Sequence, residues 1–414
     1  MENMDETIKI KHPELSRIFS FQTTGMIPPN RIAFGFGSIE QIGADAATLA
    51  KDKTKTALII SDRMLKELKI LDAATSSLSL AGFLVEAFTE VQPEPHIDAA
   101  DALYDRYLEQ EFSVVVGLGG GSVMDVAKVI AHSLGSVDPP RKYFEQNLAP
   151  QEKGVPLILV PTTSGTGSEV SPYVLLNIGH EKHFLVSPFY YPDIAIIDPL
   201  LTVSMTPSVT AYTGVDALSH AIEGMLHMNA NPLSDSLCLA GIEMIGIYLK
   251  KAVADGKNQK ARYYMSMAAT LSMMGMSMSG PLYAHSVSYV MPMYKSTPHG
   301  VGCALALPYA MAFNLPVRTS KLARIAIALG EKTSMLSEHE AAKLAVASVA
   351  RLIKDVGLPV TLAEYGGIEE GELEKMAAQM IELYPRPMNP RPMTHKESIT
   401  FWHNMWNGLI EGDV

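Results

Sequence analysis

The sequence predicts an α/β protein with a doubly wound, Rossmann-like parallel sheet in its N-terminal part and an all-α C-terminal part. In the first half, short apolar and β-branched runs alternate with helical runs, as in parallel sheets whose two faces are covered by helices. After residue 199 the strand pattern ends, and segments rich in alanine, leucine and methionine follow. The chain has 414 residues, more than one hydrophobic core usually serves. We therefore expect two domains, residues 1–200 and 201–414.

The elements of the first domain are expected in alternating order. Strands are predicted at residues 31–36, 56–61, 83–88, 113–117 and 156–160, and helices at residues 39–49, 64–73 and 97–108. The strand runs are short and apolar, whereas the helical runs space their apolar residues at helical intervals. In the second domain, the prolines between Tyr384 and Pro392 predict a loop before a final helix.

Composition excludes several classes of function. Hydrophobic residues make up 47% of the chain and charged residues 19%, which favours a packed protein over a disordered one. The net charge of −11 argues against a nucleic-acid partner, which would require a basic face. Residues 1–6 lack the apolar core of a signal peptide. We expect a cytoplasmic protein that does not bind membranes. The two cysteines, Cys238 and Cys303, are interpreted as small buried hydrophobic residues.

A glycine-rich segment follows the fourth predicted strand. Gly119, Gly120, Gly121 and Ser122 precede a helical run that contains Asp125. Glycines let the backbone approach a ligand closely, and a helix N-terminus offers free N–H groups to phosphates. Ser122 is placed to cap this helix, with Asp125 completing a capping box. Because a serine replaces the third glycine of the dinucleotide fingerprint, a simple strand-to-helix turn is the alternative to phosphate binding.

Two further polar positions follow strands. The loop after the strand at 156–160 contains Thr162 and Thr163 among small hydroxyl residues and glycines, which favours hydrogen bonding to a nucleotide at the carboxyl edge of the sheet. A flexible surface loop is the alternative. Asp62 follows the strand at 56–61 and could accept a hydrogen bond from a ribose hydroxyl, which favours NAD over NADP. Its alternative role is that of a helix N-cap.

Asp216 and His220 are four residues apart in a run compatible with a helix. Side chains at i and i+4 share one helix face, and a carboxylate and an imidazole suit Zn²⁺ or Fe²⁺. His285 and His299 could complete such a site. The alternative is an ordinary helical pair without a metal.

Taken together, these segments resemble the iron-containing (group III) alcohol dehydrogenase family. The matching segments lie at residues 119–128, 161–169, 214–224 and 297–300, within a resemblance that covers roughly residues 25–395. It implies a small primary alcohol or aldehyde substrate, NAD(H), Fe²⁺ or Zn²⁺, and at least a homodimer, with the active site between the domains. The implied metal ligands are Asp216, His220, His285 and His299. The implied cofactor contacts are Asp62, Gly119, Gly120, Gly121, Ser122, Asp125, Thr162, Thr163 and Lys182.

One position departs from the family pattern. Many members carry a second histidine four residues after the one that matches His285, whereas this chain has Tyr289. In the family this histidine is associated with proton transfer or with the nicotinamide. The pKa of a free tyrosine, about 10, makes Tyr289 a poorer base near neutral pH. The route of the proton is therefore open.

The substrate is less well defined than the reaction. We hypothesise that Lys295 or His183 helps to bind an anionic aldehyde, such as sulfoacetaldehyde or succinic semialdehyde; the alternative is that Lys295 faces solvent. Rival functions are a hydroxyacid–oxoacid transhydrogenase with bound nicotinamide, a glycerol-type polyol dehydrogenase, a dehydroquinate synthase-like lyase, and a non-catalytic nucleotide-binding protein.

Overall fold

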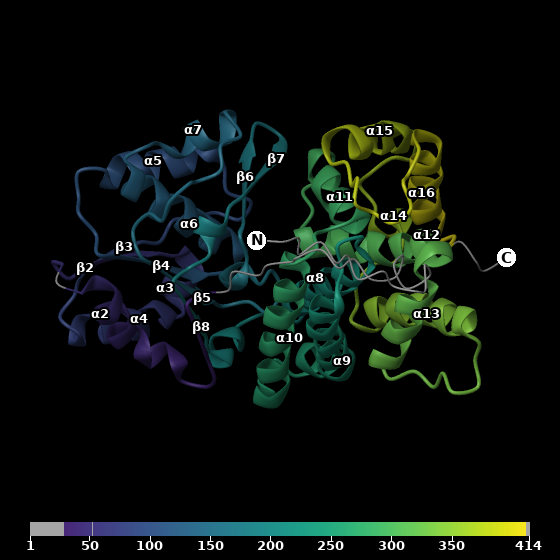
Figure 1. The fold of residues 1–414 in the computed structure, drawn as a ribbon, viewed down its shortest axis with the longest axis horizontal. Coiled ribbons are helices and arrows are strands. Elements are labelled where there is room, and N and C mark those ends of the chain that lie inside the picture. Colours follow the sequence, from purple (N-terminus) through teal and green to yellow (C-terminus); the bar gives the residue numbers. More distant parts are fainter. Residues whose placement is uncertain (1–28, 52, 411–414) are drawn as a thin grey trace, which may run out of the picture.

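The computed structural model describes residues 29–51 and 53–410. Its α/β elements and its long C-terminal helices lie side by side along the longest axis of the molecule (Figure 1). Residues 1–6, whose composition predicts that there is no signal peptide, lie outside the described residues. The last sheet strand ends at Ile197 and the first long helix of the second half begins at Pro207. The domain boundary at residue 200 stays a prediction.

Six strands form one parallel sheet, which confirms the predicted doubly wound fold class. They are ordered β1–β8–β5–β4–β2–β3. The strands are β1 (Arg31–Phe34), β2 (Thr56–Ile60), β3 (Leu84–Phe88), β4 (Val114–Gly119), β5 (Leu157–Pro161) and β8 (Ile194–Ile197). The short strand β8 is absent from the predicted set and lies between β1 and β5. The carboxyl ends of β4 and β5 meet at one edge, where Thr162 N donates to Gly119 O at 3.0 Å.

Helices cover both faces of this sheet. Ala57 and Ile59 of β2 pack with α2 (Ile42–Ala50) and α4 (Ile70–Leu80). Leu58 and Ile60 point to the other face and pack with α5 (Ile97–Tyr107) and α6 (Gly121–Ser136). Since alternate residues of a strand face opposite sides, a strand buried on both faces must be apolar throughout.

Two predicted helices are divided in the structure. The helix predicted at 64–73 is interrupted by Lys69, whose φ of 58° is left-handed; α3 (Arg63–Glu67) ends before it and α4 begins after it. A left-handed residue ends a helix and redirects the chain, and Lys69 gives no signal of this in the sequence because it is not a glycine. The helix predicted at 39–49 begins as a separate 3₁₀ turn, η1 (Ser38–Gln41).

An antiparallel hairpin lies outside the main sheet and was not among the predicted elements. It consists of β6 (Tyr173–Ile178) and β7 (Glu181–Val186), and its turn includes Gly179 with a φ of 60°. The hairpin stands on the side of the α/β half that faces the helical half (Figure 1). The backbone N–H of Lys182 donates to the hydroxyl of Tyr384 at 3.1 Å, so the hairpin joins the two halves.

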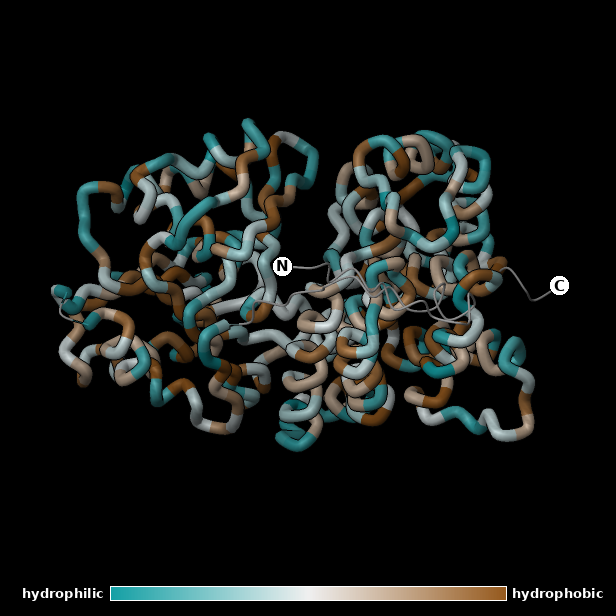
Figure 2. Tube along the Cα trace, viewed as in Figure 1, coloured by the Kyte–Doolittle hydropathy of each residue, from teal (hydrophilic) through white to brown (hydrophobic). Residues whose placement is uncertain are grey.

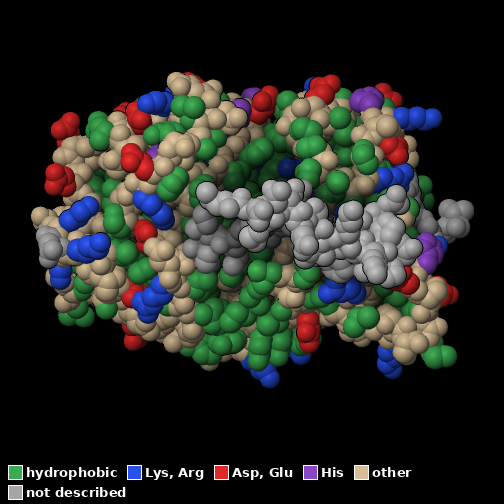
Figure 3. All heavy atoms as spheres, in the orientation of Figure 1, with side chains coloured by type: hydrophobic (Ala, Val, Ile, Leu, Met, Phe, Trp, Pro, Cys, Tyr) green, Lys and Arg blue, Asp and Glu red, His purple; other side chains and the backbone are tan. Residues whose placement is uncertain are grey.

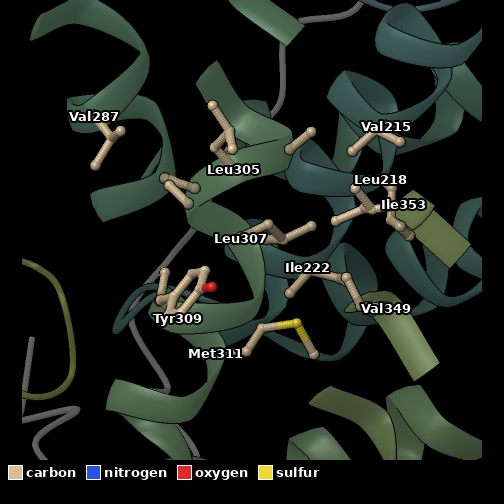
Figure 4. Close-up of a cluster of buried hydrophobic side chains, with 14 of the residues drawn as sticks. Val215, Leu218, Ile222, Val287, Leu305, Leu307, Tyr309, Met311, Val349 and Ile353 are labelled. Carbon is tan, nitrogen blue, oxygen red and sulfur yellow. The ribbon is translucent and has the colours of Figure 1, made fainter. Parts of the chain in front are cut away.

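All regular elements described after residue 206 are helical, as predicted. They are α8 (Pro207–Leu226), α9 (Pro232–Ala254), α10 (Gln259–Ser277), α11 (Tyr283–Val290), α12 (His299–Ala328), α13 (Glu338–Asp355), α14 (Leu362–Tyr365), α15 (Leu373–Leu383) and α16 (His395–Asn407), with short 3₁₀ turns between some of them. Their core gathers Leu218 and Ile222 of α8 with Leu305 and Leu307 of α12 (Figure 4).

The central helix of this core is strongly apolar. By length and composition α12 could cross a membrane, but 89% of the relevant window is buried inside the protein, as in the core helix of a soluble protein. Figure 2 shows hydrophobic segments running through the interior of both halves and hydrophilic residues at the outer loops. Burial of α8 and α12 against each other holds three of the predicted metal ligands, Asp216, His220 and His299, in fixed positions.

Candidate metal centre and cofactor cleft

Helix α8 carries the first two predicted ligands in a buried stretch. Thr206 caps its N-terminus by accepting from Val209 N, and residues 213–226 are all buried. The Nε2 atom of His220 lies 3.5 Å from Oδ1 of Asp216. In the described part of the chain, this carboxylate oxygen has no hydrogen-bond partner. The ordinary helical-pair alternative therefore leaves a buried carboxylate oxygen unsatisfied, which is costly.

The other two predicted ligands come from α11 and α12. The ring of His285, on α11, stacks against that of His220 with centroids 5.0 Å apart. His299 is the first residue of α12, and its Nε2 lies 3.5 Å from Oδ1 of Asp216. The structure thus brings together four side chains that are distant along the chain.

The residue after His299, Gly300, must be a glycine because the backbone of α8 passes very close to it. A Cβ atom at this position would lie 2.1 Å from the backbone oxygen of Tyr212, on α8. No side chain fits so close to a backbone atom, so the glycine lets the start of α12 reach α8. This contact carries His299 to Asp216.

Hydrogen bonds orient two of the imidazoles. Nδ1 of His285 lies against Oε2 of Glu223, and the Glu223 carboxylate also accepts from Leu282 N at 2.9 Å and from Ala284 N. Ser288 Oγ lies 3.0 Å from Nδ1 of His299. With Nδ1 occupied in both rings, Nε2 is left for a metal, the arrangement common among metal-bound histidines.

The charge state of the site suits a divalent cation. Burial lowers the pKa of His220 to about 4 and the pKa of His299 well below its usual value, so both imidazoles are neutral near pH 7, as metal ligands must be. Nε2 of His285 and Oδ1 of Asp216 are buried and lack hydrogen-bond partners among the described residues. A carboxylate with three imidazoles fits Fe²⁺ or Zn²⁺.

Cys303 is buried, as predicted, and it also lies in this cluster. Its Sγ lies 3.7 Å from Nε2 of His299, and donor atoms of Asp216, His285, His299 and Cys303 lie within 4.8 Å of one another. Two donors on one Zn²⁺, at about 2.1 Å and about 2.3 Å, lie about 3.6 Å apart in tetrahedral geometry. The available signal was positional, because Cys303 is one helical turn after His299.

Tyr289 lies beside the candidate metal ligands. Its ring stacks on that of His299, with centroids 5.5 Å apart and planes inclined at 22°. Burial raises the pKa of Tyr289 above its ordinary value. The phenol therefore stays protonated near pH 7 and cannot accept a proton there.

The glycine-rich segment forms the predicted strand-to-helix turn at the end of β4. Gly120, not Ser122, is the N-cap residue of α6 and provides no side-chain cap, so the predicted capping box is wrong. The helix begins earlier than predicted, and Ser122 lies in its first turn. Asp125 instead accepts from Ser168 Oγ at 2.7 Å and from Leu175 N at 3.0 Å. Its carboxylate thus ties α6 to the loop after β5 and to the hairpin.

The threonine loop packs closely against the glycines. A Cβ atom on Gly121 would lie 2.7 Å from Thr166 Cγ2, whereas one on Gly120 would lie 3.6 Å from Thr163 Cγ2. Thr162 is buried beside Gly119. Gly121 and Ser122, in the first turn of α6, are half-buried and line a cleft. The first N–H groups of a helix have no partner within the helix.

This cleft connects the glycine-rich turn with the candidate metal ligands. Its cavity volume is about 200 Å³, and its walls include Ser122 and Asp125 as well as His220, His285 and His299. Figure 3 shows a hollow in the molecular surface between the two halves.

Two predicted cofactor contacts have other partners in the structure. Lys182 lines the cleft and forms an ion pair with Glu94. The Asp62 side chain accepts from Leu65 N at 3.0 Å and caps α3, which is the alternative role considered for it. Its ribose contact stays a prediction.

The two residues suggested to bind an anionic substrate lie away from the cleft. The Lys295 ammonium donates to the backbone oxygens of Tyr365 and Gly366 at 3.0 and 2.8 Å and lies 3.6 Å from the Tyr365 ring centroid. Neither Lys295 nor His183 is among the cleft-lining residues. The hypothesis for both is wrong, as is the alternative of a solvent-directed Lys295.

Comparison with known proteins gives consistent matches along the chain. Residues 29–199 match the family model "Iron-containing alcohol dehydrogenase", and residues 210–406 match "Fe-containing alcohol dehydrogenase family, C-terminal". The chain is 36% identical over 383 residues to long-chain-alcohol dehydrogenase 1 of Geobacillus thermodenitrificans, covering 91% of this chain and 95% of that protein.

Two solved structures resemble this chain over nearly its whole length. A 1,3-propanediol oxidoreductase superimposes with a TM-score of 0.88 and 30% identity, covering 93% of this chain and 100% of that chain. A sulfoacetaldehyde reductase from Bifidobacterium kashiwanohense in complex with NAD⁺ gives a TM-score of 0.82 and 26% identity, covering 93% and 99%.

Proposed function

We propose that this chain, which belongs to the iron-containing alcohol dehydrogenase family, transfers hydride reversibly between NAD(H) and a small primary alcohol or aldehyde. Members of the family are alcohol and aldehyde oxidoreductases. In this proposal Asp216, His220, His285 and His299 hold one Fe²⁺ or Zn²⁺ ion. The observation that carries it is the convergence of these four side chains in the wall of a cleft that the glycine-rich start of α6 also lines.

In this proposal, different residues of the chain have different roles in binding and catalysis. A bound Fe²⁺ or Zn²⁺ ion supplies a Lewis acid that polarises the carbon–oxygen bond of the substrate. The backbone N–H groups of Gly121 and Ser122, at the positive end of the α6 dipole, bind the cofactor phosphates. Glu223 and Ser288 hold their histidines in the orientation that ligation requires.

The overall reaction consumes one proton in the direction of aldehyde reduction: aldehyde, NADH and H⁺ give alcohol and NAD⁺. Tyr289, with its raised pKa, stays protonated and does not act as the base in alcohol oxidation. We propose that Tyr289 instead packs against the His299 ring and limits the space beside the substrate.

A screen with purified protein tests this function. The metal-free protein is loaded separately with Fe²⁺ and Zn²⁺, and loss of NADH is followed with butanal, glycerol-type ketones and short oxo acids. Consumption of NADH with aldehydes, abolished by a chelator and restored by the metal, supports the proposal. Hydride exchange between a hydroxy acid and an oxo acid without added NADH would instead indicate the transhydrogenase. A preference for the polyol couple would indicate the glycerol-type enzyme, and no redox change with any pair would contradict all three.

A further inference from the structure

We propose that Arg386 binds the anionic group of a carboxylated or sulfonated aldehyde and so sets the substrate class of this site. The inference rests on the proposed oxidoreductase function. Arg386 lies in the proline-rich segment between α15 and α16 and lines the same cleft as the candidate metal ligands. A Lys or Arg side chain is visible inside the hollow between the two halves (Figure 3).

The guanidinium of Arg386 is held in place along one edge. Its Nε donates to Leu282 O at 3.0 Å and to Ser286 Oγ at 2.9 Å. The adjoining segment is tied down as well, since the hydroxyl of Tyr384 accepts from Lys182 N and Met388 O accepts from Met228 N at 3.1 Å. The position of the charge is therefore set before a ligand binds.

A second donor of the same guanidinium is unsatisfied. Nη2 of Arg386 is buried and has no hydrogen-bond partner among the described residues. No ion pair joins Arg386 to a carboxylate anywhere in the described part of the chain. A buried charged donor without a partner is costly, and a planar guanidinium is well suited to two parallel hydrogen bonds from a carboxylate or sulfonate.

Apart from the proposed metal ligand Asp216, the other charged groups in and behind the cleft have partners. The Lys182 ammonium pairs with Glu94, and the Asp125 carboxylate accepts from Ser168 and Leu175. The Glu223 carboxylate, behind the ligands, is occupied by His285 and two backbone N–H groups. Arg386 is thus a cationic group of the cleft that an anionic ligand can satisfy.

The distance of Arg386 from the proposed metal ligands also suits a short substrate. Its Cζ lies 5.6 Å from the ring centroid of Tyr289, and the centroid of Tyr289 lies 5.5 Å from that of His299. The guanidinium and the imidazole of the proposed ligand His299 therefore neighbour the same aromatic ring. A short chain with an aldehyde at one end and an anion at the other would cross the face or edge of this ring, with its reactive end toward the imidazoles.

The test compares substrates that differ in charge at the end remote from the aldehyde. The kcat/KM with NADH is measured for succinic semialdehyde against its methyl ester, and for sulfoacetaldehyde against propanal, in the wild type, Arg386→Met and Arg386→Lys. We expect the wild type to prefer the anionic member of at least one pair by about tenfold or more. Arg386→Met should lose about 10- to 100-fold with that anionic aldehyde, mainly through KM, while the neutral aldehyde changes little. Arg386→Lys, which keeps the charge but not the planar donor pair, should fall between the two.

A matched control separates this role from a general change of charge. Lys295→Gln removes a cation that lies outside the cleft, and it should leave the anionic-to-neutral ratio as in the wild type. A wild type that prefers the neutral aldehydes would overturn the inference. This comparison uses the wild type alone and therefore does not depend on whether a variant folds. An equal loss for both aldehydes, or a rise in the KM for NADH with both, would also overturn it and would assign Arg386 to the fold or to the cofactor phosphates. Failure of the proposed function itself looks different, because then no aldehyde is reduced by NADH.

Discussion

The carboxylate of Glu223 lies against Nδ1 of His285 and leaves Nε2 of that histidine without a hydrogen-bond partner among the described residues. Burial raises the pKa of Glu223, but the proximity of His285 and the hydrogen bonds to this carboxylate outweigh it, so that the net pKa is lowered and the carboxylate is charged. A charged acceptor behind a histidine strengthens that histidine as a metal ligand.

Glu223→Gln should therefore weaken metal binding without removing a ligand. We expect affinity for Zn²⁺ to fall about 10- to 100-fold, measured by competition with a chromogenic chelator. Glu243→Gln, at an exposed position on α9, is the control and should bind Zn²⁺ like the wild type. Equal affinities for all three proteins would mean that Glu223 does not support a metal ligand.

Gly120→Ala tests the phosphate-binding role of the α6 N-terminus. A Cβ atom there meets its nearest neighbour at 3.6 Å, whereas at Gly121 the distance is 2.7 Å. The alanine at 120 should leave the melting temperature nearly unchanged but should weaken NADH binding about tenfold, because it stands at the approach to the free N–H groups. NADH fluorescence titration measures this. Unchanged NADH affinity in a normally folded Gly120→Ala protein would argue that the cofactor binds elsewhere.

Glu169→Gln tests a pH dependence of stability. Glu169 is buried beside Lys128 and accepts from Thr270 Oγ1, and burial raises its pKa to about 7, while burial lowers the pKa of Lys128 to about 8. Between pH about 4.5 and about 7 the folded state holds the proton more tightly than the unfolded state, so this group costs roughly 3 kcal/mol of stability as the pH rises.

The glutamine variant should lose that decline and gain stability relative to the wild type as the pH approaches 7. Urea unfolding at several pH values, with Glu243→Gln as the control, measures the difference. A difference in unfolding free energy between wild type and Glu169→Gln that stays constant with pH would show that folding does not raise the pKa of Glu169.

Cys303 gives a spectroscopic prediction. A thiol one turn after His299, with Sγ 3.7 Å from its Nε2, is close enough to reach a metal held by that histidine. We expect Co²⁺-loaded wild-type protein to show a sulfur-to-cobalt charge-transfer band in the near ultraviolet, and Cys303→Ser to lack it and to lose affinity for Zn²⁺ more than for Fe²⁺, since sulfur is the softer donor. Cys238→Ser is the control. A band of equal strength in Cys303→Ser would exclude Cys303 as its source.

The sheet could be predicted from sequence because its central strands are buried on both faces and are therefore largely apolar, as in the run Thr56–Ile60. The break at Lys69 could not, since a left-handed lysine has no signal of its own. The hairpin was missed because many of its residues are not fully buried. They face solvent or the helical part of the protein, and this interrupts any apolar pattern. The domain boundary, the oligomeric state and the cytoplasmic location stay predictions.

The proposed metal ligands could be found because Asp216 and His220 share one helix turn and the two later histidines stand in recognisable segments. Their supporting residues could not, because the contact of Glu223 with His285, or of Ser288 with His299, depends on how α8, α11 and α12 pack. Arg386 was missed for a similar reason: the prolines around it indicated a loop, and nothing in that pattern shows where the guanidinium points.

The most direct test of the central claim measures metal content and NADH oxidation in one set of samples, the wild type and the Asp216→Ala, His220→Ala double variant. The account predicts one Fe²⁺ or Zn²⁺ per wild-type chain with aldehyde-dependent NADH oxidation, and in the folded double variant the loss of both. A double variant that still oxidises NADH with aldehyde at the wild-type rate would contradict it.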